Sequence, residues 1–148
     1  MPRKPRIHAP GAVYHVILRG NARQDIFSDD RDRVRFYDIL GKSTERFRHR
    51  ILAFCLMDNH VHLAVQVGDV PLSRIMQNVS LRYTQWFNWR HQKCGHLFQG
   101  RYKAILVDAD SYLLELAAYL HLNPVRAKIV DDPEQYQWSS HSAYLGNE

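Results

Sequence analysis

The chain has 148 residues, of which 45% are hydrophobic and 24% are charged, as expected for one compact globular domain rather than a disordered polymer. No uncharged apolar run approaches the roughly 18 residues of a membrane helix, and no apolar segment follows the basic N-terminus. A membrane span and a secretory signal are therefore not expected. The two cysteines are too few for a disulfide scaffold or a Cys-rich zinc module, so a reducing cytoplasm is the expected location.

The net charge of +5 is unevenly distributed along the chain. Residues 70–107 contain six basic residues and no aspartate or glutamate, whereas residues 108–148 are predominantly acidic. Aromatic residues are interleaved with these cations: Tyr83, Trp86, Phe87, Trp89, Phe98 and Tyr102. Cations that neutralise phosphates, beside rings on which bases stack, favour single-stranded nucleic acid as a partner. The alternative is a helix that buries its rings in the core and exposes its cations to solvent.

The first third of the chain predicts an arm, a strand and a helix. Residues 1–10 hold three prolines and three basic residues, which predicts a flexible basic arm ahead of a single domain over residues 11–148. Residues 12–19 are β-branched and aromatic and precede a Gly-Asn turn signal, so they predict a strand. A helix is expected to begin at Asp29-Asp30, with Val34, Tyr37, Leu40 and Phe47 at helical spacing.

The middle of the chain predicts a hairpin and a second helix. Residues 50–57 and 60–67 read as two strands joined by the tight turn pair Asp58-Asn59. Pro71 is expected just inside the start of a long helix. The apolar stripe of that helix consists of Leu72, Ile75, Met76, Val79, Tyr83, Trp86 and Phe87.

The last third of the chain predicts one more strand and further helices. Glycines bracket a loop over residues 95–100, and residues 101–108 follow it as a fourth strand. Asp110 is expected to cap a third helix, which Pro124 ends or kinks near Asn123. A turn over 131–135 and a short helix within 138–145 complete the chain. The order strand-helix-strand-strand-helix-strand predicts an α+β, ferredoxin-like split βαβ fold with an antiparallel sheet, helices on one face and extra C-terminal helices.

Two histidines at the start of the third predicted strand are candidate metal ligands. Side chains alternate between the two faces of a strand, so His60 and His62 point to the same face while Val61 points to the other. Two imidazoles one pleat apart form half of a preformed metal site. The alternative is that they are ordinary polar residues on a wet face.

A second candidate group lies on the third predicted helix. Tyr119 and Asn123 are four residues apart and therefore neighbours on one helical face, and Glu115 continues the stripe. A divalent metal on two imidazoles and the Asn123 oxygen would polarise a phosphoryl oxygen, and Tyr119 would be the nucleophile. The spacing does not establish that this helix meets the histidine strand. The alternative is an amphipathic helix whose Tyr119 packs by its ring.

Several motifs in the same order resemble those of one family. The string 56–63, Leu-Met-Asp-Asn-His-Val-His-Leu, resembles the His-hydrophobe-His signature of the single-tyrosine (Y1) transposases, the IS200-like group. Residues 119–127 resemble the nucleophile segment of the branch associated with repetitive extragenic palindromes (REP). Residues 14–21, 95–103 and 138–140 are similar to further recurring segments of that branch. Asp58 departs from the pattern, because this branch has proline there, and little effect on the chemistry is expected.

The resemblance implies a chemistry for each candidate. His60 and His62 would bind Mg²⁺ or Mn²⁺ with Asn123 as the third protein ligand, although imidazole also suits Zn²⁺. Tyr119 would attack a phosphodiester of single-stranded DNA and leave a 5′-phosphotyrosine and a free 3′-OH, which can later rejoin strands. The DNA would carry an imperfect hairpin. The branch resemblance favours a monomer, and a homodimer is the alternative.

Phosphate contacts are expected from five basic residues: Arg19, Arg82, Lys93, Arg101 and Lys103. Two other functions remain open at this point. One is a non-catalytic regulator that binds single-stranded nucleic acid on the same fold, for which Tyr119 would be dispensable. The other is a metal phosphoesterase that uses activated water, for which cleavage would survive the loss of Tyr119.

Overall fold

The computed structural model describes residues 8–141, so most of the predicted basic arm and residues 142–145 of the predicted last helix lie outside the described residues. Four strands and three helices follow one another in the expected order. They are β1 (Val13–Arg19), α1 (Asp30–Phe47), β2 (Arg50–Leu56), β3 (His60–Gln66), α2 (Leu72–His91), β4 (Lys103–Val107) and α3 (Ala109–Arg126), with short 3₁₀ turns η1 (Asn21–Arg23) and η2 (Pro133–Gln135).

The four strands form one antiparallel sheet in the spatial order β2-β3-β1-β4. This order places β3 between the two strands that flank α1, which is the split βαβ arrangement that the sequence predicts. The ferredoxin-like fold is therefore confirmed. The β2–β3 hairpin turns at Asp58-Asn59 as expected, and a backbone bond from Met57 N to His60 O of 2.9 Å closes it.

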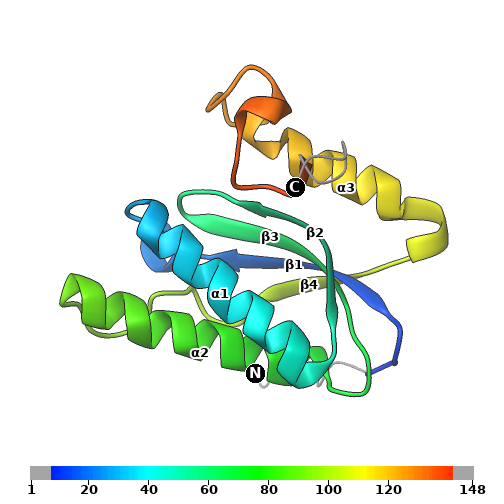
Figure 1. Cartoon of the computed structure of the whole chain (residues 1–148), viewed down its shortest axis with the longest axis horizontal. Helices are drawn as coiled ribbons and strands as arrows, with labels where there is room; N and C mark the ends of the chain where they lie inside the picture. The colour runs from blue at the N-terminus through cyan, green and yellow to red at the C-terminus, as the bar shows by residue number, and fades with distance from the viewer. Residues whose placement is uncertain (1–7, 142–148) are drawn as a thin grey trace.

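The two faces of the sheet are covered differently (Figure 1). Helices α1 and α2 lie on one face, and α3 lies on the other. The prediction of helices on one face is thus correct for α1 and α2, and the appended helix α3, for which the sequence predicts no face, lies on the other. Along β3, Val61, Leu63 and Val65 point into the large core beneath α1 and α2, so His60 and His62 point toward α3. We call the face covered by α1 and α2 the closed face, and the face covered by α3 the open face.

The closed face carries most of the apolar core. Tyr83 and Phe87 of α2 are fully buried there, and six of the seven predicted stripe residues of α2 are buried. In α1 the predicted stripe is displaced, because Phe36 and Ile39 are buried whereas Val34 is 56% exposed. Most of the aromatic rings in residues 70–107 thus belong to the core. Of the six aromatic residues named there in the sequence analysis, only Trp89 is largely exposed, at 76%.

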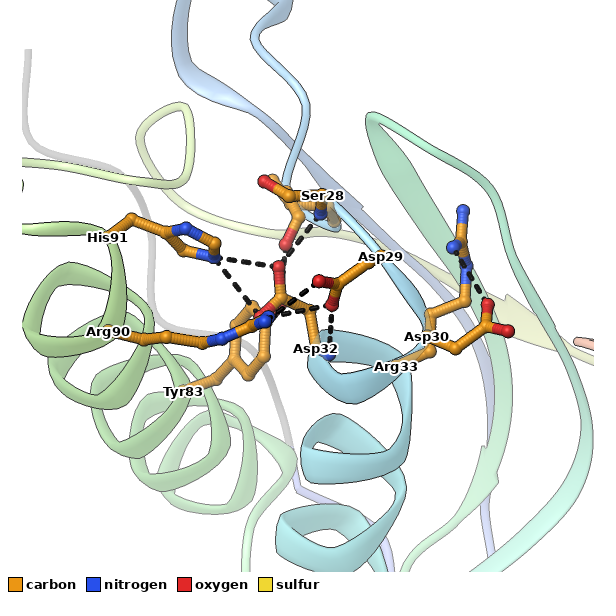
Figure 2. Close-up of polar contacts among 9 residues, drawn as sticks. Ser28, Asp29, Asp30, Asp32, Arg33, Tyr83, Arg90 and His91 are labelled. Carbon is orange, nitrogen blue, oxygen red and sulfur yellow. Dashed lines mark hydrogen bonds and ion pairs between the residues drawn. The ribbon is translucent and has the colours of Figure 1, made fainter.

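A polar cluster fastens α1 to α2 at one end of the closed face (Figure 2). The Asp32 carboxylate is completely buried and accepts hydrogen bonds from Ser28 N, Arg90 Nη1 and His91 Nε2 at 2.8, 2.6 and 2.9 Å. Arg90 also makes a bidentate ion pair with Asp29, the N-cap of α1, and this hydrogen bond holds the pKa of Asp29 well below its usual range. The start of α1, correctly predicted at Asp29-Asp30, is therefore fixed by the end of α2.

The C-terminal segment follows the outer edge of β2. Leu56 N donates to Trp138 O at 2.8 Å, and Ser140 N donates to Phe54 O at 3.0 Å. Between them, Ser139 pairs with Cys55 in an isolated antiparallel β-bridge. Residues 138–140 are therefore strand-like rather than the start of the predicted helix. Such pairing protects an exposed sheet edge.

Helix α3 differs from its prediction at both ends. Its N-cap is Asp108, which accepts from the backbone of Asp110 and Ser111, so Asp110 lies inside the first turn. The helix continues through Pro124 to Arg126. Because proline removes only its own N–H, one hydrogen bond near the C-terminus is lost and the last turn still forms. None of the helices in the described range is long and apolar enough to cross a membrane.

Candidate active site

His60 and His62 lie side by side on the open face, as the strand period predicts. Their ring centroids are 5.0 Å apart. His60 is opposite Arg19 of β1 in the register, and His62 is opposite Ile17. The sequence folds this way locally because Val61 is fully buried in the closed-face core and fixes the register of the strand.

Both imidazoles are held through their Nδ1 atoms. His60 Nδ1 donates to Asn59 Oδ1 at 2.8 Å, and His62 Nδ1 is hydrogen-bonded to Nε2 of His15, on β1, at 3.0 Å. When the second nitrogen of a histidine is fixed in this way, the first is oriented as a metal ligand. The sequence indicates His15 only as a strand residue near the site. Its strand period, which places it on the same face as Arg19, is the signal that could have identified it.

The three imidazoles are neutral at neutral pH. Burial lowers the pKa of His62 to about 3, and the neighbouring imidazoles and the charges of Arg19 and Arg126 disfavour its protonation further. Burial also lowers the pKa of His15, and burial followed by the Arg19 charge lowers the pKa of His60. A neutral imidazole has a free lone pair, which is the form that binds a metal.

Tyr119 is brought to these histidines from the facing side of α3. Its ring centroid is 6.1 Å from those of both His62 and His15. Its side chain is 48% exposed, so the phenol is accessible from solvent. The Arg126 guanidinium lies 4.2 Å from the ring centroid and donates a hydrogen bond to Tyr119 O. Arg126 is a neighbour that sequence reasoning missed, although it lies seven residues after Tyr119, two helical turns along the same face.

Asn123 and Glu115 lie on the same helix as Tyr119 but make no such contact. Asn123 is half-buried, and its carbonyl accepts from Ala127 N. No hydrogen bond joins the Asn123 amide or the Glu115 carboxylate to either histidine in residues 8–141. Within the same residues, no three His, Cys, Asp or Glu side chains are grouped so as to hold a metal ion. The histidine pair therefore accounts for two ligands at most from these residue types.

The donor set fits a divalent ion with open coordination positions. Both candidate imidazoles are neutral, and their Nδ1 contacts leave the Nε2 atoms available. An amide oxygen from Asn123 and phosphate oxygens would complete a set of mixed nitrogen and oxygen ligands. Imidazole suits Mn²⁺ and Zn²⁺, and oxygen donors suit Mg²⁺ and Mn²⁺.

Three of the five basic residues predicted to contact phosphate gather beside this site. Arg19, Arg101 and Lys103 line one hollow of about 430 Å³ together with Ile17 and neighbouring loop residues. Lys103 is opposite Ile17 in the β1–β4 register, so its side chain lies on the open face with the histidines. A cationic hollow next to two imidazoles suits a nucleic-acid backbone.

The other two predicted basic residues lie elsewhere. Arg82 lines a separate hollow between α1 and α2 together with Trp86 and Trp89. Lys93 lies beyond the C-terminus of α2, with its ammonium 5.7 Å from the Phe87 ring centroid. The structure therefore does not bring Arg82 and Lys93 together with Arg19, Arg101 and Lys103.

Backbone contacts at the end of β1 explain two of the sequence motifs. Gly20 N donates to Asn59 O at 2.8 Å, and a Cβ at Gly20 would lie 2.0 Å from Gln24 O, so only glycine fits there. The loop before β4 pairs with the same end, because Gln99 N donates to Arg19 O at 2.8 Å. These contacts position Arg19, the hairpin turn and the cationic loop relative to one another.

Asp58 has a structural role of its own in the hairpin turn. Its carboxylate accepts from Arg33 of α1 at 2.5 Å, and its carbonyl accepts from the backbone N–H groups of Ile26 and Phe27. The turn that carries Asn59 and His60 is thus tied to α1 by a side chain that proline would not supply.

The sequence and the fold were each compared with known proteins. The sequence model of the family described as "Transposase IS200 like" matches residues 9–123, which include every candidate ligand and Tyr119. No curated protein sequence matches the chain closely enough to count as a relative.

Two solved structures are similar to this fold. One is described as a REP-associated tyrosine transposase bound to a REP hairpin; it has a TM-score of 0.76 and 15% identity, and the match covers 95% of this chain and 82% of that one. The other is described as a candidate transposase from Deinococcus radiodurans R1, with a TM-score of 0.55, 15% identity, and coverage of 80% of this chain and 96% of that one. At these identities the likeness establishes the fold.

Proposed function

Because the chain belongs to the IS200-like transposase family, we propose that it is a metal-dependent transposase that cleaves and rejoins single-stranded DNA through a 5′-phosphotyrosine on Tyr119. The observation that carries the proposal is the approach of Tyr119 to His62. Their rings come from α3 and β3, which are separated by more than 40 residues in sequence, and still lie with centroids 6.1 Å apart on the open face. Tyr119 is exposed to an incoming strand while His62 is fixed beneath it.

The chemistry is a transesterification that changes one phosphodiester for another. Tyr119 Oη forms a bond to phosphorus while the bond from phosphorus to the 3′-oxygen breaks. The phenol loses one proton to water and the departing 3′-oxygen gains one, so nothing is oxidised or reduced. The free 3′-OH can reverse the step, and rejoining therefore requires no external energy source.

His60, His62 and the Asn123 oxygen would hold Mg²⁺ or Mn²⁺. When bound, this ion supplies charge neutralisation at the reacting phosphate. His15 and Asn59 orient the two imidazoles through Nδ1. Arg126 holds the Tyr119 ring by its cation–π contact.

The DNA substrate would lie along the cationic hollow. Arg19, Arg101 and Lys103 neutralise backbone phosphates next to the histidines. One protein of similar fold is described as bound to a REP hairpin, which supports a hairpin-bearing single strand as the partner here. A monomer is the proposed state, since every residue of the proposed site comes from one chain. A cytoplasmic location is proposed with it.

A covalent-adduct assay tests the proposal. The protein is incubated with labelled single-stranded hairpin oligonucleotides from DNA that flanks its own gene, with Mn²⁺ or Mg²⁺, and the products are separated on denaturing gels. We expect a protein–DNA band that requires metal, disappears in Tyr119→Phe and persists in Tyr37→Phe. The control removes a phenol from the closed face, where Tyr37 packs against Phe54 and Trp138.

The other outcomes correspond to the two alternative functions. Cleavage without an adduct that survives in Tyr119→Phe would identify water as the nucleophile. Binding without cleavage or adduct across these oligonucleotides would identify a non-catalytic regulator.

A further inference from the structure

A second hollow adjoins Tyr119 on the side away from His60. It lies between β4 and α3 and has a volume of about 560 Å³. Its lining includes His15, Ile105 and Val107 on the sheet side, and Tyr112, Glu115 and Tyr119 on the helix side. This volume is within the range of pockets that hold small ligands, roughly 300–1,000 Å³. We call it the α3–β4 hollow.

Large apolar side chains are exposed in this hollow. Ile105 is 51% exposed and Tyr112 is 56% exposed, and the half-exposed Tyr119 ring stands beside them. The three helix residues are spaced by three and four positions, so they form one stripe that faces the sheet. An apolar floor opposite a row of aromatic rings suits a flat, aromatic ligand.

The charge of the hollow is opposite to that of the cationic hollow. No lysine or arginine lines it, whereas two carboxylates do, from Asp108 and Glu115. Asp108 is already used as the N-cap of α3. Glu115 makes no hydrogen bond or ion pair with any residue in the described range, so its carboxylate is a free acceptor. A phosphate is disfavoured here, and a group that donates a hydrogen bond is favoured.

We propose that the α3–β4 hollow binds one unpaired nucleobase with an exocyclic amino group, from a nucleotide beside the phosphate that Tyr119 attacks. The ring lies between β4 and Tyr112, and the Glu115 carboxylate accepts from the amino group. Cytosine, adenine and guanine have such a group and thymine does not. This inference rests on the proposed function, because it assumes that the DNA strand passes Tyr119. The phosphates of the strand would then lie toward Arg19 and one base toward α3.

Equilibrium binding tests the inference without requiring cleavage. Fluorescence anisotropy measures the affinity of the Tyr119→Phe protein for labelled oligonucleotides that carry one abasic site at each successive position of the single-stranded flank. We expect one position, next to the cleaved phosphate, at which base removal weakens binding about tenfold. At that position, an analogue of the natural base that lacks only the amino group should bind about fivefold to tenfold more weakly than the natural base.

Substitutions in the hollow should remove this preference. Glu115→Ala is expected to make the natural base and its analogue without the amino group bind equally. Glu134→Ala, which removes an exposed carboxylate of η2, should retain the difference. Tyr112→Ala should abolish the effect of the abasic site. Leu114→Ala is the control on the same helix, because Leu114 is exposed but does not line the hollow. Circular dichroism verifies that each variant is folded.

The outcomes distinguish this inference from the proposed function. If the wild-type protein forms the Tyr119 adduct but the abasic scan is flat, or Glu115→Ala retains the base preference, the hollow does not bind a base and the transposase proposal stands. If no adduct forms but the Glu115-dependent preference appears, the hollow is confirmed and the catalytic proposal fails. If sedimentation shows a dimer that Ile105→Asp dissociates, and the scan is flat, the apolar floor is covered by a second copy of the chain and the inference is wrong.

Discussion

The two faces of the sheet differ in what they contain: the closed face holds most of the apolar core, and the open face holds the candidate site. The closed face packs Tyr83, Phe87 and Phe36 beneath two long helices and fixes the helix ends with the buried Asp32 carboxylate. The open face has a smaller apolar cluster under α3, buries His15 and His62, and leaves Tyr119 and two hollows near solvent. Successive residues of one strand serve both faces, since Val61 is core while His60 and His62 belong to the site. A single strand register therefore determines both the packing and the geometry of the candidate site.

The difference indicates how the imidazoles are held rigidly while Tyr119 stays accessible to solvent. The histidines project from a strand whose other side lies in a close-packed core, and side chains on such elements are positioned more accurately than those on loops. Tyr119, the proposed nucleophile, lies on a helix that packs on the same sheet through Ala117 and Leu120. Variants of the closed face should therefore change stability, and variants of the open face should change metal or DNA binding.

The largest expected effect belongs to the closed face. Asp32→Asn leaves Arg90 and His91 facing a neutral amide at a buried position, and we expect the free energy of unfolding to fall by about 3 kcal/mol. Urea denaturation monitored by tryptophan fluorescence measures this loss. Asp38→Asn, which removes a surface pair with Lys42, is the control and should change stability by less than about 1 kcal/mol. Equal losses in the two variants would contradict a structural role for the buried cluster.

The next effect belongs to the open face. His15→Phe removes the hydrogen bond to His62 Nδ1 and retains a ring of similar size, so the affinity for Mn²⁺ should fall about 10-fold to 100-fold. Titration of Mn²⁺ followed by electron paramagnetic resonance measures it. His121→Asn is the control, because it removes an imidazole that is hydrogen-bonded to Ser140 and His141. Unchanged affinity in His15→Phe would show that His15 does not support His62.

A pH effect is expected at a histidine away from the site. Burial lowers the pKa of His49 to about 4 from its ordinary value of 6.5. The unfolded chain then binds more protons than the folded one between these values, so stability falls as the pH decreases from about 6.5 to about 4. The contribution of His49 to this loss should reach about 2.5 kcal/mol at pH 4.5. Urea unfolding at pH 7 and pH 4.5 should show a smaller acid loss in His49→Gln than in the wild type, and an identical loss would refute the assignment. His96→Gln is the control.

The smallest effects are expected from single basic residues, in a comparison of those that line the cationic hollow with those that do not. Arg101→Ala and Lys103→Ala should each weaken binding of single-stranded DNA several-fold and reduce the salt dependence of the affinity by about 0.7 in log–log slope. Arg82 and Lys93 lie away from the cationic hollow, so Arg82→Ala and Lys93→Ala should each change the affinity for single-stranded DNA by less than about twofold. Anisotropy titrations at several salt concentrations measure both quantities. A larger effect of Arg82 than of Arg101 would place the DNA across α1 and α2 instead.

Local sequence signals predicted the order of elements and the orientation of the histidine pair. The β-strand period alone places His60 and His62 on one face, and Asp29 is a capping residue in the position where such residues begin helices. These features depend on neighbours in the chain, so a single sequence is sufficient to predict them.

Features that depend on distant contacts could not be predicted in the same way. The packing of α3 on the opposite face, and hence the approach of Tyr119 to His62, is a tertiary contact between α3 and β3. The displaced stripe of α1 has a similar cause, because α2 and the sheet together determine that Phe36 and Ile39 rather than Val34 are buried. Asp58 shows the same limit, since its partner Arg33 lies 25 residues away.

Identification of the residue that becomes linked to DNA tests whether Tyr119 is the nucleophile. The wild-type protein is trapped with its oligonucleotide and metal, digested with nuclease and trypsin, and analysed by tandem mass spectrometry. The expected tryptic peptide spans residues 104–126 and contains both Tyr112 and Tyr119. The masses of its fragments therefore show which of the two tyrosines carries the nucleotide. We expect a phosphonucleotide on Tyr119 alone. A modification on Tyr112, or a cleaved strand with no modified tyrosine, would contradict this expectation.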